Sequence, residues 1–320
     1  MTEKQQYDVV VIGGGAAGLS GALALSRARR AVLVVDAGQP RNAPAGHVHN
    51  YLGREGTPPG ELLAAGRAEV ASYGGEVVSG TVTAVAADDD GFLVRVGPAA
   101  VRARRVLVAT GLTDELPPVP GLAERWGRSV LHCPYCHGYE VRDQGIGLIG
   151  TNPFAVHGAL MWRQWSPDIT LFVHTAPEPD IEERERLDAR GIRVVTGPVA
   201  GIEGEADVRM ESGLLVPRHA LVVATRLTAR AGVLAGLGLT PEPRERDGVV
   251  IGTEIPAGPT GQTAIPGVYV AGNVSDVLGQ VIGSASAGLT VAAALNADLI
   301  EEDTRRAVAG RRRPIPEGAR

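Results

Sequence analysis

The chain has 320 residues, of which 44% are hydrophobic, and its formal net charge is −5. This length and composition suit a globular protein of two domains, and the slightly acidic balance excludes a basic field that would favour nucleic acid or an anionic membrane as a partner. No apolar run approaches the roughly 20 residues that span a bilayer, and the polar start MTEKQQ lacks the features of a secretory signal. We therefore expect a cytoplasmic protein with no membrane contact.

The first residues of the chain follow the order strand, glycine turn, helix, strand and acid. An apolar, β-branched run over Tyr7–Ile12 predicts a buried strand, and it leads into Gly13–Gly18, which fits G-x-G-x-x-G. Helical spacing follows over 19–30, and a second strand over Ala31–Val35 ends at Asp36. In this order the glycines let backbone approach a pyrophosphate, the helix N-terminus supplies N–H donors, and the acid accepts from ribose hydroxyls. The segment predicts a dinucleotide site, with tight helix–strand packing as the alternative.

A second unit of similar shape begins near Gly145. Its predicted elements are a strand at 146–150, a helix at 155–165 and a strand at 168–174. Asn152 takes the place of the middle glycine, and the segment after the last strand contains Glu178 and Asp180 but no arginine. The 2′-phosphate of NADPH would meet carboxylates where it needs cations. We expect a nucleotide-domain fold that has lost its ligand contacts.

Two further regions complete the pattern. Residues 75–111 predict short β segments with an acidic turn, ending in a buried strand and a glycine. Near the C-terminus, Gly267–Asn273 predicts another buried strand before a glycine turn, and 284–300 predicts a helix whose small residues suit close packing. The charged, proline-containing end of the chain, 305–320, is expected to be a frayed tail.

Both cysteines of the chain, Cys133 and Cys136, lie in the sequence HCPYCHGY at 132–139. A C-x-x-C pair can be a disulfide redox centre, C-x-x-C-H can carry a c-type haem, and Cys with His can bind zinc. Haem attachment normally needs export, and a structural zinc site needs about four ligands, which would all come from one hexapeptide. An inert pair of buried thiols is the remaining alternative. Proline and histidine around the pair favour reactivity, so we prefer a redox-active pair and expect no metal site.

Together these motifs resemble the low-molecular-weight thioredoxin reductase family over the chain to about residue 300. The matching segments are GGGAAG at 13–18, VHNYLG at 48–53, VLVATG at 106–111, the C-x-x-C-x-G box at 133–138 and IPGVYVAGNVSD at 265–276. The resemblance implies an α/β fold of two Rossmann-like, three-layer nucleotide-binding domains, the second inserted in the first. The expected limits are 1–113 and 243–320 for the two segments of the FAD-binding domain, and 114–242 for the NADPH-like domain that carries CPYC.

FAD is the cofactor that the resemblance implies. Asn273 stands where the family usually has aspartate, and Arg41 follows the Asp36 strand, where it is expected to touch an adenosine phosphate. The expected cofactor-binding residues are Gly13, Gly14, Gly15, Ala16, Ala17, Gly18, Asp36, Arg41, Asn50, Val82, Thr110, Gly111, Gly272, Asn273, Gln280 and Val281.

Departures from the family pattern favour a different flow of electrons. GTNPFA and HTA replace the nucleotide motif and the basic sequence of the family, and His137 replaces the aspartate after the second cysteine. This combination resembles the branch of flavin dithiol oxidases that form disulfide natural products, antibiotics among them. It implies a small dithiol substrate whose electrons pass through CPYC and FAD to O2, giving H2O2. The family resemblance also implies a homodimer.

Cys133, Cys136 and His137 are the expected catalytic residues. By family analogy a substrate thiolate attacks Cys133, while Cys136 stands beside the flavin. His137 deprotonates a thiol or stabilises a thiolate near neutral pH, and a purely structural hydrogen bond at a helix start is its alternative role. His132 is a weaker candidate for the same task. The competing functions are an NAD(P)H- or ferredoxin-driven reductase of thioredoxin or another disulfide, and a redox-responsive flavoprotein without catalysis.

Overall fold

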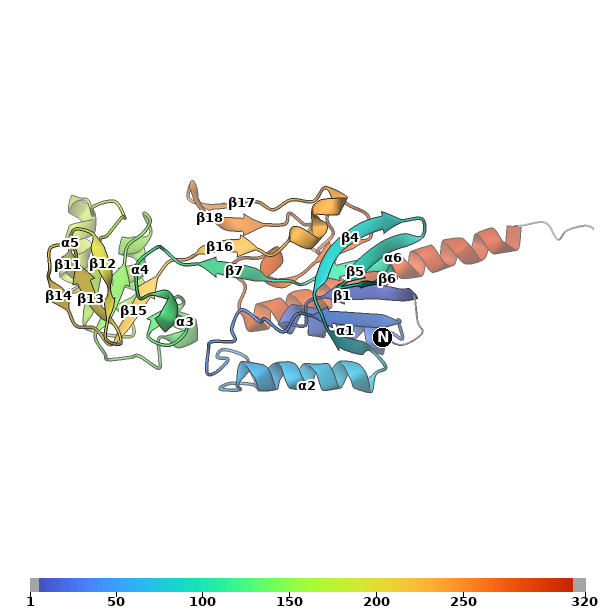
Figure 1. Cartoon of the computed structure of the whole chain (residues 1–320), viewed down its shortest axis with the longest axis horizontal. Helices are drawn as coiled ribbons and strands as arrows, with labels where there is room; N and C mark the ends of the chain where they lie inside the picture. Colours follow the sequence, from blue (N-terminus) through green and yellow to red (C-terminus); the bar gives the residue numbers. More distant parts are fainter. Residues whose placement is uncertain (1–5, 313–320) are drawn as a thin grey trace, which may run out of the picture.

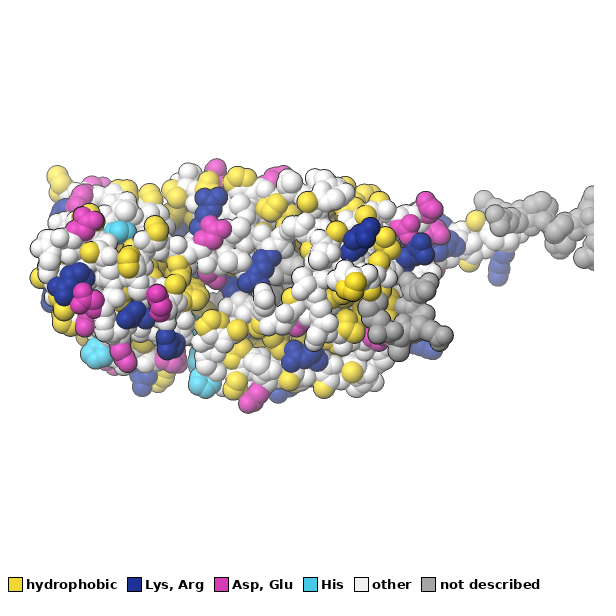
Figure 2. Space-filling model, viewed as in Figure 1, with side chains coloured by type: hydrophobic (Ala, Val, Ile, Leu, Met, Phe, Trp, Pro, Cys, Tyr) yellow, Lys and Arg dark blue, Asp and Glu magenta, His cyan; other side chains and the backbone are white. Residues whose placement is uncertain are grey.

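The computed structural model describes residues 6–312, which form two bodies joined by a pair of strands (Figure 1). The terminal body is built from residues 6–115 and 226–312, and the inserted body from residues 116–225. On the face drawn in Figure 2, cationic and anionic side chains are interspersed rather than gathered into a field of one sign. No helix within the described part of the chain is both long and apolar enough to cross a membrane.

A seven-stranded sheet forms the centre of the terminal body. Its order is β3 (Glu76–Ser79), β2 (Val32–Asp36), β1 (Gln6–Ile12), β6 (Ala99–Val108), β5 (Gly91–Val96) and β4 (Val82–Asp88), with β19 (Val268–Val270) also paired to β6. β6 has two partners on one side, because its residues 99–103 pair antiparallel with β5 and its residues 106–108 pair parallel with β19. β1, β2, β3, β6 and β19 run parallel, so their carboxyl ends meet at one edge.

Helices and a second layer of chain cover the two faces of this sheet. α1 (Ala16–Arg27), α2 (Pro59–Ser72) and α6 (Val281–Arg312) share one hydrophobic cluster with β1 and β2. The expected close packing of small residues is found, because a Cβ at Gly288 of α6 would lie 2.1 Å from the Ala17 carbonyl oxygen of α1. β4, β5 and the short helix η2 (Gly232–Leu237) take part in the cluster on the opposite face. The three-layer arrangement predicted from the sequence is confirmed.

The inserted body repeats this design on a smaller scale. Its parallel sheet has the order β11 (Arg193–Val195), β10 (Ile169–Phe172), β9 (Ile146–Ile149), β15 (Ala220–Val223) and β8 (Val130–Leu131). One core cluster includes side chains of α4 (Ala155–Trp162) and α5 (Ile181–Ala189). The other includes an antiparallel sheet of β12 (Val199–Glu203), β13 (Asp207–Met210) and β14 (Leu215–Val216). The predicted second nucleotide-type fold, inserted in the first, is therefore also confirmed.

A four-stranded sheet at the junction corrects the domain limit expected at residue 242. The chain leaves the terminal body in β7 (Leu112–Glu115) and returns in β16 (Arg226–Ala229), which pairs with β7 and is joined by β17 (Glu242–Arg246) and β18 (Val249–Glu254). Ala229 and Leu234 belong to the core of the terminal body. The chain therefore returns near residue 225, because the apolar residues beyond that point are buried against the first sheet.

The end of the chain differs from the expected frayed tail. α6 continues past residue 305, where that tail was expected to begin, and ends at Arg312. Glu302 and Arg306, one turn apart on this helix, form an ion pair at 2.6 Å. Such pairs stabilise a charged helix that leaves the body. The rest of the expected tail, 313–320, lies outside the described residues.

Ion pairs fasten α6 to the beginning of the chain. They join carboxylates of α6 to arginines that follow α1 or belong to β6: Arg30–Asp303 (2.7 Å), Arg104–Asp303 (2.5 Å), Arg105–Asp298 (2.6 Å) and Arg105–Glu302 (2.8 Å). The arginine side chains are almost buried, with 11 to 13% of their surface exposed. Buried cations need such partners, so these arginines depend on the carboxylates of α6 to balance their charge.

Candidate functional site

A single cavity of about 980 Å³ is lined by both bodies. The terminal body contributes the glycine turn before α1 and the loops after β2, β6 and β19, all at the carboxyl edge of its sheet. The inserted body contributes the cysteine turn and the loop after β9. Because doubly wound sheets bind their ligands at this edge, the cavity is the candidate functional site.

The glycine turn presents bare backbone to the cavity. Gly15 caps α1 without a side chain, and nothing lies within 4 Å of the position that a Cβ would take there. The first amides of α1 have no acceptor within the helix and carry the positive end of its dipole. Gly18 has another role, because a Cβ there would lie 1.9 Å from the Gly13 carbonyl oxygen. One glycine thus leaves room for a pyrophosphate, and the other lets the helix close onto the turn.

Two polar groups beside this turn suit the rest of a dinucleotide. Asp36 at the end of β2 accepts hydrogen bonds from the Gly14 amide at 3.1 Å and the Gly38 amide at 3.2 Å, which fixes its carboxylate at the cavity wall. The Thr110 hydroxyl, after β6, is buried and has no hydrogen-bond partner within residues 6–312. A buried hydroxyl without a partner is unfavourable, and a ligand in the cavity would satisfy it. The residues present fit FAD.

Most of the residues expected from sequence to contact the cofactor line this cavity. They are Gly13, Gly14, Gly15, Ala16, Ala17, Asp36, Arg41, Thr110, Gly111, Gly272, Asn273, Gln280 and Val281. Gly18, Asn50 and Val82 are not part of its lining. Val82 is buried in the core of the terminal body, and Asn50, in the left-handed region at φ +59°, donates its side-chain amide to the Tyr135 carbonyl at 2.6 Å. Asn50 therefore joins a loop of the terminal body to the cysteine turn.

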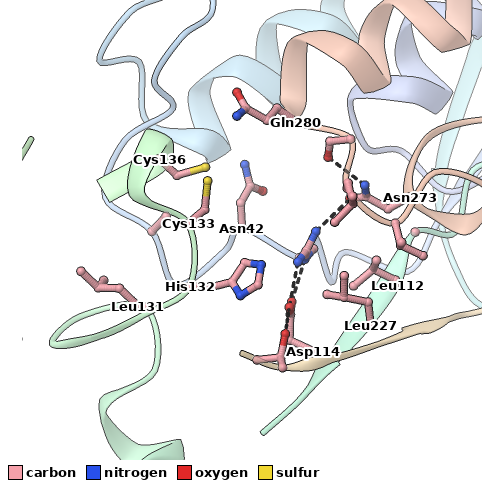
Figure 3. Close-up of a pocket in the computed structure, with 18 of the residues that line it drawn as sticks. Asn42, Leu112, Asp114, Leu131, His132, Cys133, Cys136, Leu227, Asn273 and Gln280 are labelled. Atoms are coloured by element: carbon pink, nitrogen blue, oxygen red, sulfur yellow. Dashed lines mark hydrogen bonds and ion pairs between the residues drawn. The ribbon is translucent and has the colours of Figure 1, made fainter. Parts of the chain in front are cut away.

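The two thiols lie at the start of the one-turn helix α3 (Pro134–His137), and both are directed into the cavity (Figure 3). Both are half-buried, so exposure alone does not show which is attacked first. The hydrogen bond from the Cys136 thiol is the main cause that lowers the pKa of Cys133 to about 7; burial opposes it and backbone amides assist it. The same bond, with burial, raises the pKa of Cys136. Cys133 is therefore the thiolate of the reduced pair near neutral pH.

Two histidines flank the cysteine pair and line the cavity. Burial lowers the pKa of His137, although Glu140 opposes this effect. Burial also lowers the pKa of His132, whose Nδ1 lies 3.4 Å from the Val223 carbonyl oxygen. Both imidazoles are therefore neutral near pH 7 and can accept a proton from a thiol. In the described part of the chain, no group of three or more His, Cys, Asp or Glu side chains could hold a metal ion.

The Arg41 side chain is held by other residues of the cavity wall. Its Nε and Nη2 donate to the two oxygens of Asp114 in β7 at 2.6 and 2.7 Å, and its Nη1 lies 3.4 Å from the Asn273 side-chain oxygen. Thr225, just before β16, donates to the same carboxylate at 2.8 Å. Sequence reasoning missed Asp114 and Thr225, because they lie 73 and 184 positions from Arg41 and carry no local motif.

The side chain of Asn273, in the short helix η3 (Gly272–Val274), is fixed by its own loop. Its amide nitrogen donates to the carbonyl oxygens of Asp276 and Gly279, both at 2.8 Å. An aspartate, which is the usual residue at this position in the family that the sequence resembles, could make neither donation. The loop after η3 therefore accounts for the amide here, and this amide turns its oxygen toward Arg41.

The corresponding turn of the inserted body is arranged differently. The Asn152 side chain accepts a hydrogen bond from the Phe154 amide at 2.9 Å, so an amide at the entry of α4 already has a partner. His174, at φ +50°, accepts from the Val199 amide at 3.0 Å with its Nδ1. The carboxylate of Asp180 caps α5 as part of a capping box. This turn also lines the cavity, but it carries the Asn152 side chain where the glycine turn of the terminal body has bare backbone.

The fold and the cavity define a class of protein: a flavoprotein oxidoreductase in which a cysteine pair and an FAD cradle face one space. The chain belongs to the pyridine nucleotide-disulphide oxidoreductase family, which it matches over residues 7–290. FAD is the cofactor of this thioredoxin reductase-like family.

Individual relatives agree with this assignment. The chain is 31% identical over 300 residues to thioredoxin reductase tcpT of Claviceps purpurea, covering 88% of this chain and 90% of the relative. Among solved structures it is similar to an oxidoreductase from Agrobacterium tumefaciens, with 37% identity, a TM-score of 0.87, and 92% and 99% of the two chains covered. It is also similar to HlmI, with 44% identity, a TM-score of 0.87, and 97% and 98% covered. The expected fold, enzyme class and cofactor are confirmed.

Proposed function

We propose that this flavoprotein is a dithiol oxidase, which forms an intramolecular disulfide in a small dithiol natural product and passes the electrons to O2. One observation carries the proposal: the open glycine turn and the cysteine pair line a single cavity. The second nucleotide turn lines the same cavity, but there the Asn152 side chain already accepts a hydrogen bond from the Phe154 amide. Electrons can then enter from thiols without a pyridine nucleotide. A cavity of about 980 Å³ has room for a metabolite beside the cofactor.

The proposed steps follow thiol–disulfide exchange. A substrate thiolate attacks Sγ of Cys133 in the oxidised pair, the Cys133–Cys136 bond breaks, and Cys136 leaves as a thiolate. The second substrate thiol loses its proton and attacks the substrate sulfur bound to Cys133, so the cyclic disulfide leaves and Cys133 is released as a thiolate. His137, neutral near pH 7, accepts the proton of the second substrate thiol.

The cofactor would be held by the glycine turn, Asp36, Thr110 and the loop after β19. When bound, FAD supplies a two-electron acceptor that molecular oxygen can reoxidise. The balance is one dithiol and one O2 consumed, and one cyclic disulfide and one H2O2 formed.

Anaerobic mixing tests this function. We expect a small dithiol such as dithiothreitol to bleach the flavin absorbance of the purified protein, and NADPH and NADH to leave it unchanged over the same time. Readmitted O2 should restore the colour and yield one H2O2 for each dithiol oxidised. The Cys133→Ser, Cys136→Ser double variant, with FAD bound, is the control that should not bleach. Rapid bleaching by NADPH would overturn the proposal.

The second candidate is a disulfide reductase driven by NAD(P)H. One observation favours it: Arg246 of β17 lies over the Phe154 ring at 5.0 Å, which brings a cation from the terminal body to the second nucleotide turn. A cation there could meet a phosphate. The same anaerobic experiment separates the two functions, because only the reductase accepts electrons from NAD(P)H.

Location and assembly belong to the proposal as well. We propose a cytoplasmic homodimer, because dimers are common in the family that the sequence resembles and a reducing compartment keeps a dithiol substrate reduced. Size-exclusion chromatography with light scattering, which gives the mass in solution, tests the dimer. Fractionation of cells that produce the protein tests its location.

A further inference from the structure

The cavity contains a charged group that the proposed steps do not use. Asp114, whose side chain is only 7% exposed, holds Arg41 through two hydrogen bonds, and Thr225 donates to the same carboxylate. Asp114 lies in the strand by which the chain leaves the terminal body, and Thr225 lies directly before the strand by which it returns. The guanidinium is thus fixed to both connections between the bodies by a planar, bidentate pair.

This fixed cation lines the same cavity as the cysteine turn. In Figure 3 the dashed bonds run from Asp114 to Asn273, and His132 and Asn42 lie between them and the two sulfurs. After the hydrogen bond within the pair and burial, the charge of Arg41 is a further cause that lowers the pKa of both Cys133 and Cys136. Arg41 therefore shares the cavity with the thiols, and its charge favours their thiolate forms.

The other titratable groups near the cysteine pair are either neutral near pH 7 or paired with an opposite charge. His132 and His137 are neutral near pH 7, and Asp114 is already neutralised in part by Arg41. His49 and Glu140 face each other at the outer end of α3, at 3.5 Å. An arginine guanidinium is a permanent cation in proteins, so Arg41 adds a constant charge to the larger effect of the Cys136 hydrogen bond, although Asp114 offsets part of that charge.

We propose that Arg41 is a positioning residue of the dithiol site, anchored by Asp114 and Thr225 so that its cation stabilises the thiolate formed on the cysteine pair. Its part in turnover rests on the proposed function. Its effect on the reduced pair does not, because that effect is present whatever later accepts the electrons. A long-range charge of this kind lowers a thiol pKa through space, without touching sulfur.

The test measures how the alkylation of Cys133 depends on pH. The FAD-loaded protein is reduced, freed of reductant under anaerobic conditions and treated with iodoacetamide, and the modified cysteine is located by mass spectrometry. In Arg41→Gln, which can still donate to Asp114 but has no charge, we expect the midpoint to rise by roughly half a pH unit. Below the midpoint the alkylation rate should then fall roughly threefold. Arg41→Lys should restore most of the reactivity.

Arg230 provides a matched control. Like Arg41, it links the loop after β2 to β7, because it donates to the Thr113 hydroxyl and to the Gln39 carbonyl, both at 2.9 Å. It is not among the charges that shift the pKa values of the cysteines. Arg230→Gln should titrate like the unmodified protein. The inference is overturned if Arg41→Gln keeps the original midpoint, or if Arg230→Gln moves it equally. If the thiols behave as expected but no dithiol is oxidised by the unmodified protein, the proposed function fails and this inference stands.

Discussion

Among single residues, the cysteine pair sets the chemistry through one shared hydrogen bond. The hydrogen bond from the Cys136 thiol to Cys133 makes two otherwise similar thiols different, because it lowers the pKa of Cys133 and raises the pKa of Cys136. The thiolate is the reactive form of cysteine. The reduced protein should therefore have one nucleophile, Cys133, at neutral pH rather than two equal ones.

The pH dependence of this nucleophile is the first prediction at this scale. Because the pKa of Cys133 is lowered to about 7, its alkylation rate should rise about tenfold per pH unit below that value and level off above it. In Cys136→Ala the donor is lost, so the midpoint should move up toward the ordinary value of 9.0. Stopped-time alkylation of the reduced proteins measures both curves. Identical midpoints would refute the role of the hydrogen bond.

Whether a site residue could be predicted from sequence depends on how far its partners lie from it along the chain. The cysteines, His137 and the glycine turn could be predicted from sequence, because each belongs to a motif of a few residues whose spacing carries the chemistry. The partner of Arg41 could not, since Asp114 and Thr225 meet it only after the sheet at the junction has formed. The contact of Asn50 with the Tyr135 carbonyl of the other body could not be predicted either, because no motif connects the two residues.

Among the secondary-structure elements, α1 shows why the spacing of the glycines matters. Gly15 and Gly18 belong to one motif, yet the space around them differs completely: one faces the open cavity and the other touches the Gly13 carbonyl. Gly15 also has an ordinary extended backbone, with φ −79°. An added methyl group should therefore affect binding at the first position and folding at the second.

Two alanine substitutions test this difference. Gly18→Ala should lower the free energy of unfolding by about 3 kcal/mol, because a backbone oxygen cannot move away as a side chain can. Gly15→Ala should cost less than about 1 kcal/mol in stability as a poorer helix cap and should weaken FAD binding by obstructing the pyrophosphate. Denaturant unfolding without cofactor and titration with FAD separate the two effects. Equal stability of both variants would contradict this account.

Local patterns predicted the elements around each glycine or asparagine turn, but not α2, α5, the strands between residues 193 and 254, or where the chain returns. Residues 226–229 follow the strand at 220–223 after only two residues, and their pairing with β7 shows that they belong to the junction. The expected tail from 305 was wrong for a similar reason. Its charged residues indicate disorder when taken alone, whereas in the structure the helix continues through them, supported by the pair between Glu302 and Arg306.

For the molecule as a whole, contacts at the cavity rim join the two bodies in addition to the linking strands. The Asn50 side chain donates to the Tyr135 carbonyl at 2.6 Å, and His49 lies 2.6 Å from Glu55 and 3.5 Å from Glu140. These residues connect the loop after β2 with α3 and its outer end. The placement of the cysteines thus depends on the terminal body as well as on their own.

Removing this contact should loosen the cysteine turn without unfolding either body. In Asn50→Ala we expect faster amide hydrogen exchange at residues 134–140 and a change in unfolding free energy of no more than about 1 kcal/mol, because both cores are intact. Hydrogen-exchange mass spectrometry measures the first, and denaturant unfolding the second. Asn42→Ala, in the same cavity, is the control. The rim contact is unimportant if the two variants exchange alike.

The ion pairs of α6 also set an order of events during synthesis. Arg30, Arg104 and Arg105 are synthesised early, but their acidic partners on α6 emerge only after residue 297, although Arg104 also has an earlier partner, Asp8. β19, which completes the parallel part of the first sheet, is also late. The sheet of the inserted body, by contrast, is complete once residue 223 has emerged. In a nascent chain the inserted body can therefore fold first, whereas the terminal body is complete only after α6 has been synthesised.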